Sequence, residues 1–192
     1  MSLSELEPSE VWRDTWARLV RATHDHRHAF RQPVVATHCP RLGVHARTVV
    51  LRHAEPKDAQ LTLYTDGRSG KLEALRLEPS LSWCFYDGRQ RIQVRAMSRA
   101  TVHVGDAVAY AAWEQQGTAA RALYAVEPAP ATRLAAGESP TFREGDDAGF
   151  ESFAVVVCAV GELDWLHLGR TAHRRIRFEP GHGGWQGARI VP

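Results

Sequence analysis

Two short segments of the chain carry side chains that suit a phosphate group. The first is Arg47-Thr48-Val49-Val50-Leu51-Arg52, a β-branched run between two arginines, and the second, Tyr64 to Lys71, contains Thr65, Arg68, Ser69 and Lys71 around a glycine turn. Arginine binds paired phosphate oxygens, lysine acts as a point charge, and hydroxyls and turn amides complete the hydrogen bonding. If the segments form paired strands, we predict a phosphate site where they meet. Two ordinary strands with solvated ends would also explain the pattern.

The spacing of these residues limits how they can act. Arg47 and Arg52 are five residues apart, so on one regular strand they point to opposite faces and cannot both reach one phosphate. The run Gly67-Arg68-Ser69-Gly70-Lys71 is not a nucleotide P-loop. It has two residues rather than four between its glycines, and a leucine follows its lysine.

Bulk composition favours one globular domain over residues 1–192. Apolar residues make up 44% of the chain and charged residues 24%, which are ordinary globular values. The formal charge of +2 is too small to indicate a nucleic-acid or anionic-membrane partner. The acidic start has no apolar signal region and the longest apolar run, 153–160, is too short to span a bilayer, so we expect a cytoplasmic protein.

The hydrophobic pattern predicts an α+β protein. An amphipathic helix is expected from Ser9 to about His28, and further helices over 68–78, 106–113 and 118–124. Strands are predicted over 34–37, 47–52, 60–65, 81–86, 92–104, 153–160, 163–168, 173–178 and 185–191. Their short connections indicate an antiparallel β-barrel. The loop 127–149 has no periodicity, and a loop of this length is usually functional or mobile.

The order of three segments resembles a known family. "RTVVLR", then "LTLYTDGRSGK", then "RQRIQV" is similar to the flavin-binding core of the pyridoxamine 5'-phosphate oxidase-like FMN-binding split barrels. The resemblance implies an antiparallel split β-barrel of six to seven strands flanked by helices. It also implies FMN as cofactor, a small-molecule substrate, and a homodimer with the flavin between the subunits.

A C-terminal stretch extends the resemblance. Residues 163–178 are similar to the family's "W…R-x-H-x-R" pattern, with Trp165, His173 and Arg175 on its tryptophan, histidine and second arginine. Thr171 stands where the first arginine is expected. The closing "WQGARIVP" is likewise similar to the family's "W…RLxP".

The resemblance assigns roles to individual residues. Arg47 would bind the FMN phosphate with Ser69 and Lys71, and Gln90 or Arg91 would meet the pyrimidine edge of the ring. His173 is the candidate for orienting substrate or relaying a proton, and Arg52 or Arg175 would stabilise negative charge on the ring. The predicted catalytic residues are His173 and Arg52. The predicted cofactor-binding residues are Arg47, Thr48, Val49, Val50, Arg52, Tyr64, Thr65, Arg68, Ser69, Lys71, Gln90, Arg91, Trp165 and Arg175.

One departure from the family concerns its substrate. A true pyridoxamine phosphate oxidase grips the substrate phosphate with a Tyr-x-x-x-Arg-x-x-x-Ser helix, and this chain has Tyr110, Glu114 and Thr118 there. A glutamate in place of the arginine would repel a dianion. We therefore predict an FMN-dependent oxidoreductase with a different substrate. The alternatives are a true pyridoxamine or pyridoxine 5'-phosphate oxidase, and a non-catalytic flavin, pyridoxal phosphate or haem binder of the same fold.

Two histidines near the N-terminus could be metal ligands. His24 and His28 are four residues apart on the predicted helix and would share one face. Since no third ligand is evident, a solvated helix end is favoured and no metal site is predicted.

Overall fold

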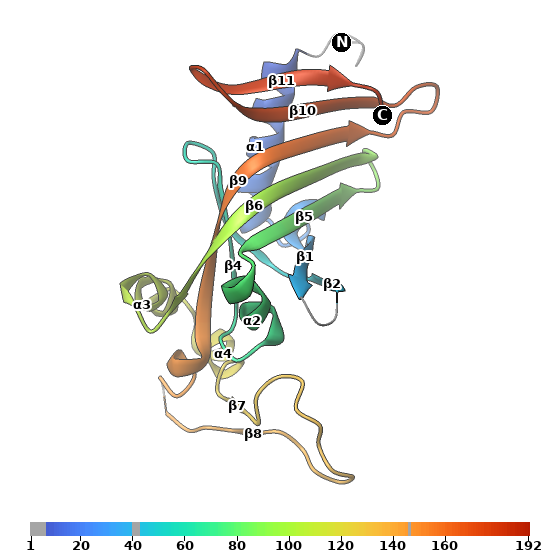
Figure 1. Ribbon diagram of the computed structural model, residues 1–192. Helices are drawn as coiled ribbons and strands as arrows, with labels where there is room; N and C mark the ends of the chain where they lie inside the picture. Colours follow the sequence, from blue (N-terminus) through green and yellow to red (C-terminus); the bar gives the residue numbers. More distant parts are fainter. Residues whose placement is uncertain (1–6, 40–42, 146) are drawn as a thin grey trace.

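The structure is a computed structural model that describes residues 7–39, 43–145 and 147–192. Its main feature is a nine-stranded antiparallel sheet with the strand order β11-β10-β9-β6-β5-β1-β2, to which β4 and its partner β3 are added through β9 (Figure 1). The helices are α1 Pro8–His24, α2 Gly70–Leu77, α3 Ala107–Glu114 and α4 Thr118–Ala122. The strands are β1 Val34–Cys39, β2 Gly43–Thr48, β3 Leu51–Glu55, β4 Gln60–Asp66, β5 Ser80–Asp87, β6 Ile92–Val104, β7 Val126–Glu127, β8 Thr141–Phe142, β9 Phe153–His167, β10 Arg174–Gly181 and β11 Gly184–Ile190.

Two long strands, β6 and β9, hold the sheet together. They pair along almost their whole length, while β4 pairs with the first half of β9 and β10 with its second half. Near Gly161 the neighbour of β9 on this edge changes from β4 to β10, so the sheet divides there. The predicted break between 160 and 163 is wrong, because a register shift between Met97 and Ser98 lets β9 continue past the glycine.

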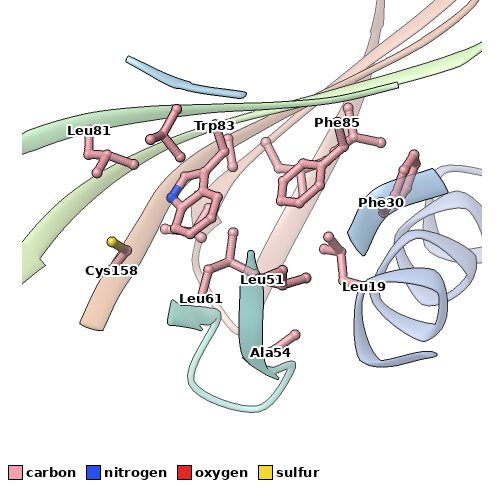
Figure 2. Packing of buried hydrophobic residues seen from close by; sticks show 14 of the residues in the cluster. Leu19, Phe30, Leu51, Ala54, Leu61, Leu81, Trp83, Phe85 and Cys158 are labelled. Carbon is pink, nitrogen blue, oxygen red and sulfur yellow. The ribbon is translucent and has the colours of Figure 1, made fainter. Parts of the chain in front are cut away.

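The core lies between this sheet and α1. Leu19 on the helix and Phe30, in a short 3-10 helix (Ala29–Arg31), face Phe85 and Trp83 on β5 (Figure 2). Burying large apolar side chains of this kind stabilises the fold by about 1.5–3 kcal/mol each. Cys158 lies in the same core, and burial raises the pKa of its thiol to about 12, so it acts as a packing residue.

The first helix begins and ends earlier than predicted. It starts at Pro8 rather than Ser9, because Glu7 is its N-cap and forms a capping box with Glu10. It ends at His24, and the His28 side chain instead accepts a hydrogen bond from the Phe30 N–H at 3.1 Å. His24 and His28 therefore do not share a helical face. In the described part of the chain, no group of three or more His, Cys, Asp or Glu side chains could hold a metal ion.

The predicted strand 47–52 is also wrong as one element. β2 ends at Thr48 and pairs with β1, whereas β3 begins at Leu51 and pairs with β4. Between them, the Val49 N–H donates to Pro33 O at 3.0 Å. The chain changes partners here, so Arg47 and Arg52 lie on different strands.

The α+β fold class is confirmed. The sheet contains nine strands rather than six to seven, partly because the 47–52 run contributes to two of them. Within the described ranges, no helix combines the length and apolar character that a membrane crossing requires.

Candidate functional site

Two cations face each other where β1, β2, β4 and α2 meet. Arg47 on β2 donates to the Thr37 hydroxyl on β1 at 2.8 Å. Lys71, in the first turn of α2, donates to the hydroxyls of Thr65 at 2.6 Å and Ser69 at 3.2 Å. Among the described residues, neither cation contacts a carboxylate. This Arg47–Lys71 cation pair brings together four of the residues predicted to bind phosphate and adds Thr37, which the sequence analysis missed.

The electrostatics of the pair favour an anion. Burial, and next the charge of Arg47, lowers the pKa of Lys71 from its ordinary value. Burial also lowers the pKa of Arg47. Both shifts mean that the charged forms are partly stripped of water and, at Lys71, repelled by a like charge. A dianion between the two side chains would reverse this cost, and the N-terminus of α2 adds to the attraction.

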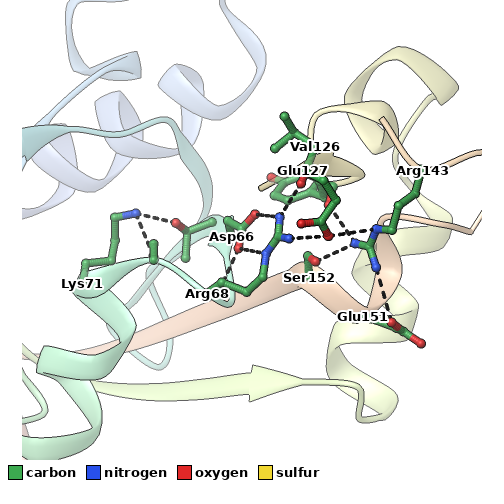
Figure 3. Close-up of polar contacts among 11 residues, drawn as sticks. Asp66, Arg68, Lys71, Val126, Glu127, Arg143, Glu151 and Ser152 are labelled. Carbon is green, nitrogen blue, oxygen red and sulfur yellow. Dashed lines mark hydrogen bonds and ion pairs between the residues drawn. The ribbon is translucent and has the colours of Figure 1, made fainter. Parts of the chain in front are cut away.

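Arg68 does not point at this cation pair, although it was predicted to bind the cofactor. Its guanidinium holds both Asp66 oxygens, at 3.0 and 2.8 Å, and also contacts Glu127 and the Val126 carbonyl (Figure 3). Asp66 is the nearby carboxylate that would weaken the positive field at Lys71. Arg68 therefore neutralises Asp66 and ties the turn before α2 to β7.

Arg52 and Tyr64 form a second group, which the 48–50 segment and the neighbouring residues Tyr64 and Thr65 on β4 link to the cation pair. The Arg52 guanidinium lies 5.4 Å from the centre of the Tyr64 ring, a cation–π contact. Its Nε atom is buried and has no hydrogen-bond partner among the described residues. Burial raises the pKa of Tyr64, which keeps the phenol neutral. Because Tyr64 and Thr65 are adjacent on β4, their side chains point to opposite faces.

The segment between Arg47 and Arg52 connects the two groups. Thr48 is the last residue of β2, and Val49 and Val50 lie outside both flanking strands. These three residues were predicted to contact the cofactor through their position in the run. The structure brings them next to both Arg47 and Arg52, and their contact with a cofactor stays a prediction.

Gln90, Arg91 and Trp165 lie elsewhere in the chain. Thr37 pairs with Leu81 at one end of β5, whereas Gln90 and Arg91 are in the turn beyond its other end at Asp87. Six residues of strand separate these ends, which is about 20 Å. Trp165 is buried in the core beside α1 and, with Gln90, lines a cavity there.

Arg175 lies on the face of the sheet opposite to Trp165. In the β9–β10 ladder Arg175 pairs with Leu166, whereas Trp165 pairs with Ile176. The guanidinium of Arg175 binds both oxygens of the buried Asp164, which Arg95 also contacts. Burial alone would raise the pKa of Asp164, but the hydrogen bonds from Arg175 and Arg95 outweigh it and the pKa is lowered.

The ladders place a different glutamine beside Arg175. The cross-strand row runs from Arg175 through Leu166 on β9 and Gln93 on β6 to Tyr86 on β5. Gln93 and Leu166 were missed as candidates, although strand alternation around the buried Val94 and Trp165 could have found them. Trp165 and Gln90 do not share this face.

His173 lies in the exposed loop between β9 and β10. Its charge is one of the minor causes that lower the pKa of His167, which places it near the end of β9. The structure does not bring it to the Arg47–Lys71 cation pair within one chain. Its predicted role with the substrate stays a prediction.

Comparisons with known proteins agree with this architecture. A structure from Nostoc punctiforme, described as a pyridoxamine 5'-phosphate oxidase-related FMN-binding protein, is 22% identical, with a TM-score of 0.78 over 98% of this chain and 100% of that one. PhzG from Burkholderia lata, solved with tetrahydrophenazine-1-carboxylic acid, is 14% identical, with a TM-score of 0.72 over 97% and 93%. A haem-binding protein from Mycobacterium smegmatis is 15% identical, with a TM-score of 0.50 over 91% and 56%.

The sequence alone also identifies the family. A comparison with curated proteins finds no match. The family model described as pyridoxamine 5'-phosphate oxidase, FMN-binding domain, matches residues 9–104, which include all but the first residue of α1, the Arg47–Lys71 cation pair and β6. The chain therefore belongs to the pyridoxamine 5'-phosphate oxidase FMN-binding domain family.

Proposed function

We propose that the protein binds FMN and acts as a flavin-dependent oxidoreductase on a small-molecule substrate. The observation that carries this proposal is the Arg47–Lys71 cation pair, which has hydroxyl neighbours and no carboxylate contact among the described residues. The phosphate of FMN carries up to two negative charges and matches two cations. Membership of the FMN-binding family supports the same ligand.

The residues beside the cation pair fit the rest of such a ligand. Bound FMN would supply the redox chemistry of the site. Arg52 offers a buried Nε without a partner among the described residues, and Tyr64 covers one side of its guanidinium. A fixed cation of this kind stabilises negative charge on a neighbouring ring or substrate. We propose that Arg52 has this role and that the 48–50 segment lies along the ligand.

We further propose that each flavin site is shared by two copies of the chain. Thr48 on β2 and Asp164 on β9 lie in one cross-strand row that passes through β1, β5 and β6. The four inter-strand spacings between them add up to about 19 Å along the sheet. A ligand that lies along the 48–50 segment therefore does not also reach Arg175, which Asp164 holds, in the same chain. The same face exposes apolar side chains, with Val34 41%, Tyr86 50% and Met97 46% accessible. A two-fold dimer through this face would bring the Gln93–Arg175 row to the partner site.

A complementation experiment tests the shared site. The Lys71→Met homodimer and the Arg175→Ala homodimer should each bind FMN about tenfold or more weakly than the wild-type protein does. Co-expressed as a heterodimer, they form one site with Lys71 from one chain and Arg175 from the other, so half of the sites should regain wild-type affinity. Light scattering that gives a 21.4 kDa monomer with FMN bound, or a heterodimer with no recovered site, would contradict the proposal.

The absorbance spectrum of the loaded protein separates FMN from haem. We expect flavin peaks after incubation with FMN and removal of excess ligand, and no retained Soret band after the same treatment with haemin. Retention of haem but not FMN would favour the non-catalytic alternative.

A further inference from the structure

Three polar side chains lie together on the face of β4 opposite to Thr65. Arg52 on β3 lies over the ring of Tyr64 on β4, and Tyr124 is in the turn between α4 and β7. The rings of both tyrosines contact Phe153, with ring centres 5.1 Å apart for Tyr64 and 4.9 Å for Tyr124. Phe153 is fully buried, so both tyrosines pack on one fixed side chain. We name Arg52, Tyr64 and Tyr124 the Arg52–tyrosine group.

The polar atoms of this group are open to solvent. Neither phenol oxygen has a hydrogen bond among the described residues, and both oxygens are accessible. The two terminal nitrogens of Arg52 are accessible in the same way, whereas its Nε is buried. Burial raises the pKa of Tyr64 and of Tyr124, so both phenols stay protonated and can donate a hydrogen bond. The group therefore presents one positive charge and several donors to a ligand.

The base of the 127–149 loop fixes the position of Tyr124. Arg143, near the far end of the loop, donates to the Tyr124 carbonyl at 3.4 Å and to the Ser152 hydroxyl at 2.7 Å (Figure 3). Gly149 packs closely on the same residue, since a Cβ added there would lie 3.0 Å from the Tyr124 Cβ. A phenol that is already held in place loses little conformational entropy when it binds a ligand.

The charges around the group suit a monoanion. Asp66 is the carboxylate whose charge reaches Tyr124, and Arg68 binds both of its oxygens. Arg52 contacts no carboxylate in the described part of the chain, so its charge is available. A carboxylate has two oxygens with about four acceptor positions, which guanidinium N–H and phenol O–H groups can fill. A phosphate dianion would leave one of its two charges uncompensated here.

We propose that the Arg52–tyrosine group binds the substrate through a carboxylate, so that the substrate class is an organic monocarboxylate. The guanidinium of Arg52 binds the carboxylate oxygens, and the phenols of Tyr64 and Tyr124 donate to the same oxygens. Tyr124 is then a further residue that sets substrate specificity. The role of this group as a substrate site rests on the proposed flavin function, because the 48–50 segment proposed to lie along the flavin leads directly to β3 and Arg52.

Calorimetry with three probes tests the ligand class. Benzoate is the carboxylate, benzamide is its neutral analogue of similar shape, and phenyl phosphate is a dianion at about pH 8. Each is titrated into the full chain loaded with FMN. Benzoate should bind saturably below about 10 mM, and benzamide at least about tenfold more weakly, because its bond to Arg52 is no longer between two charged groups. Phenyl phosphate should bind no more tightly than benzoate.

Two substitutions with matched controls connect the binding to named atoms. Arg52→Met removes the cation and should weaken benzoate binding at least about tenfold, whereas Arg76→Met, at the exposed end of α2, should leave it unchanged. Tyr124→Phe keeps the ring and removes one donor, so it should weaken benzoate at least about threefold and leave FMN affinity within about twofold. Tyr110→Phe, on α3 where the residue is 51% exposed, is its control and should change neither affinity.

A third variant separates this inference from the flavin function. The Lys71→Met protein, which is expected to lose FMN, should still bind benzoate, and adding Arg52→Met to it should remove that binding. Loss of FMN binding alone would affect only the proposed flavin function. Loss of benzoate binding in the Lys71→Met protein would place benzoate at the Arg47–Lys71 cation pair and overturn the carboxylate site.

Three other results would overturn the carboxylate site while FMN binding is intact. The first is no saturable benzoate binding, or equal affinity for benzamide. The second is unchanged benzoate affinity in either folded variant, Arg52→Met or Tyr124→Phe. The third is phenyl phosphate binding at least about tenfold more tightly than benzoate, which would indicate a phosphorylated substrate instead.

Discussion

Lys71→Met is expected to weaken FMN binding by about tenfold to a hundredfold or more. Lys71 is one of two cations at the proposed phosphate position, and it donates to Thr65 and Ser69. Hydrogen bonds to a charged group contribute about 1.5–3 kcal/mol each, and about 1.4 kcal/mol corresponds to a factor of ten in the dissociation constant. Methionine preserves most of the side-chain shape while it removes the charge. Titration of the protein into FMN, followed by flavin fluorescence, measures the change.

The chain contains a matched control. Lys57, the other lysine, is exposed in the turn between β3 and β4. Lys57→Met removes the same net charge from the molecule but should leave FMN affinity within about twofold of wild type. Equal weakening by both substitutions would mean that overall charge rather than the local site attracts the ligand.

Pyridoxamine 5'-phosphate is expected to be a poor substrate. We expect this protein to bind it about a hundredfold to ten-thousandfold more weakly than an oxidase that has both phosphate-binding arginines does. Glu114 and Thr171 stand in place of two phosphate-binding arginines, and two charge-assisted contacts are worth about 3–6 kcal/mol. The structure adds a second reason. Glu114 ends α3 and Thr118 begins α4, so the three residues of the oxidase pattern do not lie on one continuous helix.

Arg121 does not restore this site. The Arg121 guanidinium lies 5.1 Å from the centre of the Trp113 ring and 3.5 Å from an Asp147 oxygen. It also donates to the carbonyls of Gln116 and Glu114. These contacts hold it in the α3–α4 region. An oxygen-coupled assay of FMN-loaded protein decides the matter: robust pyridoxal 5'-phosphate formation at micromolar substrate would show that the inference from Glu114 is wrong.

Strand alternation made parts of the fold predictable. β6 was predicted with its observed bounds, Ile92–Val104, because buried and exposed residues alternate along most of it. The cation pair was also predictable, since Ser69 and Lys71 are close in sequence and Arg47 directly precedes a β-branched run. In both cases the local pattern agrees with the tertiary environment.

Other features depend on which strands meet. Nothing between Arg47 and Arg52 signals that the chain leaves β1 and joins β4, since valines suit either strand. The sequence around Gly161 predicted the end of a strand. The register shift opposite this glycine, which lets β9 continue, is a property of the pair β6 and β9 and not of one segment. Placing Gln93 and Leu166 in one row with Arg175 requires the register between β6, β9 and β10. Cross-strand register is not encoded within a single segment.

The most direct test of the account compares FMN with riboflavin on the wild-type protein. The two ligands share the ring and differ in the phosphate, which is the group proposed to lie between Arg47 and Lys71. We expect FMN to bind at least about tenfold more tightly, because charge-assisted bonds of about 1.5–3 kcal/mol act only on the phosphate. Equal affinities for the two flavins would contradict the central claim.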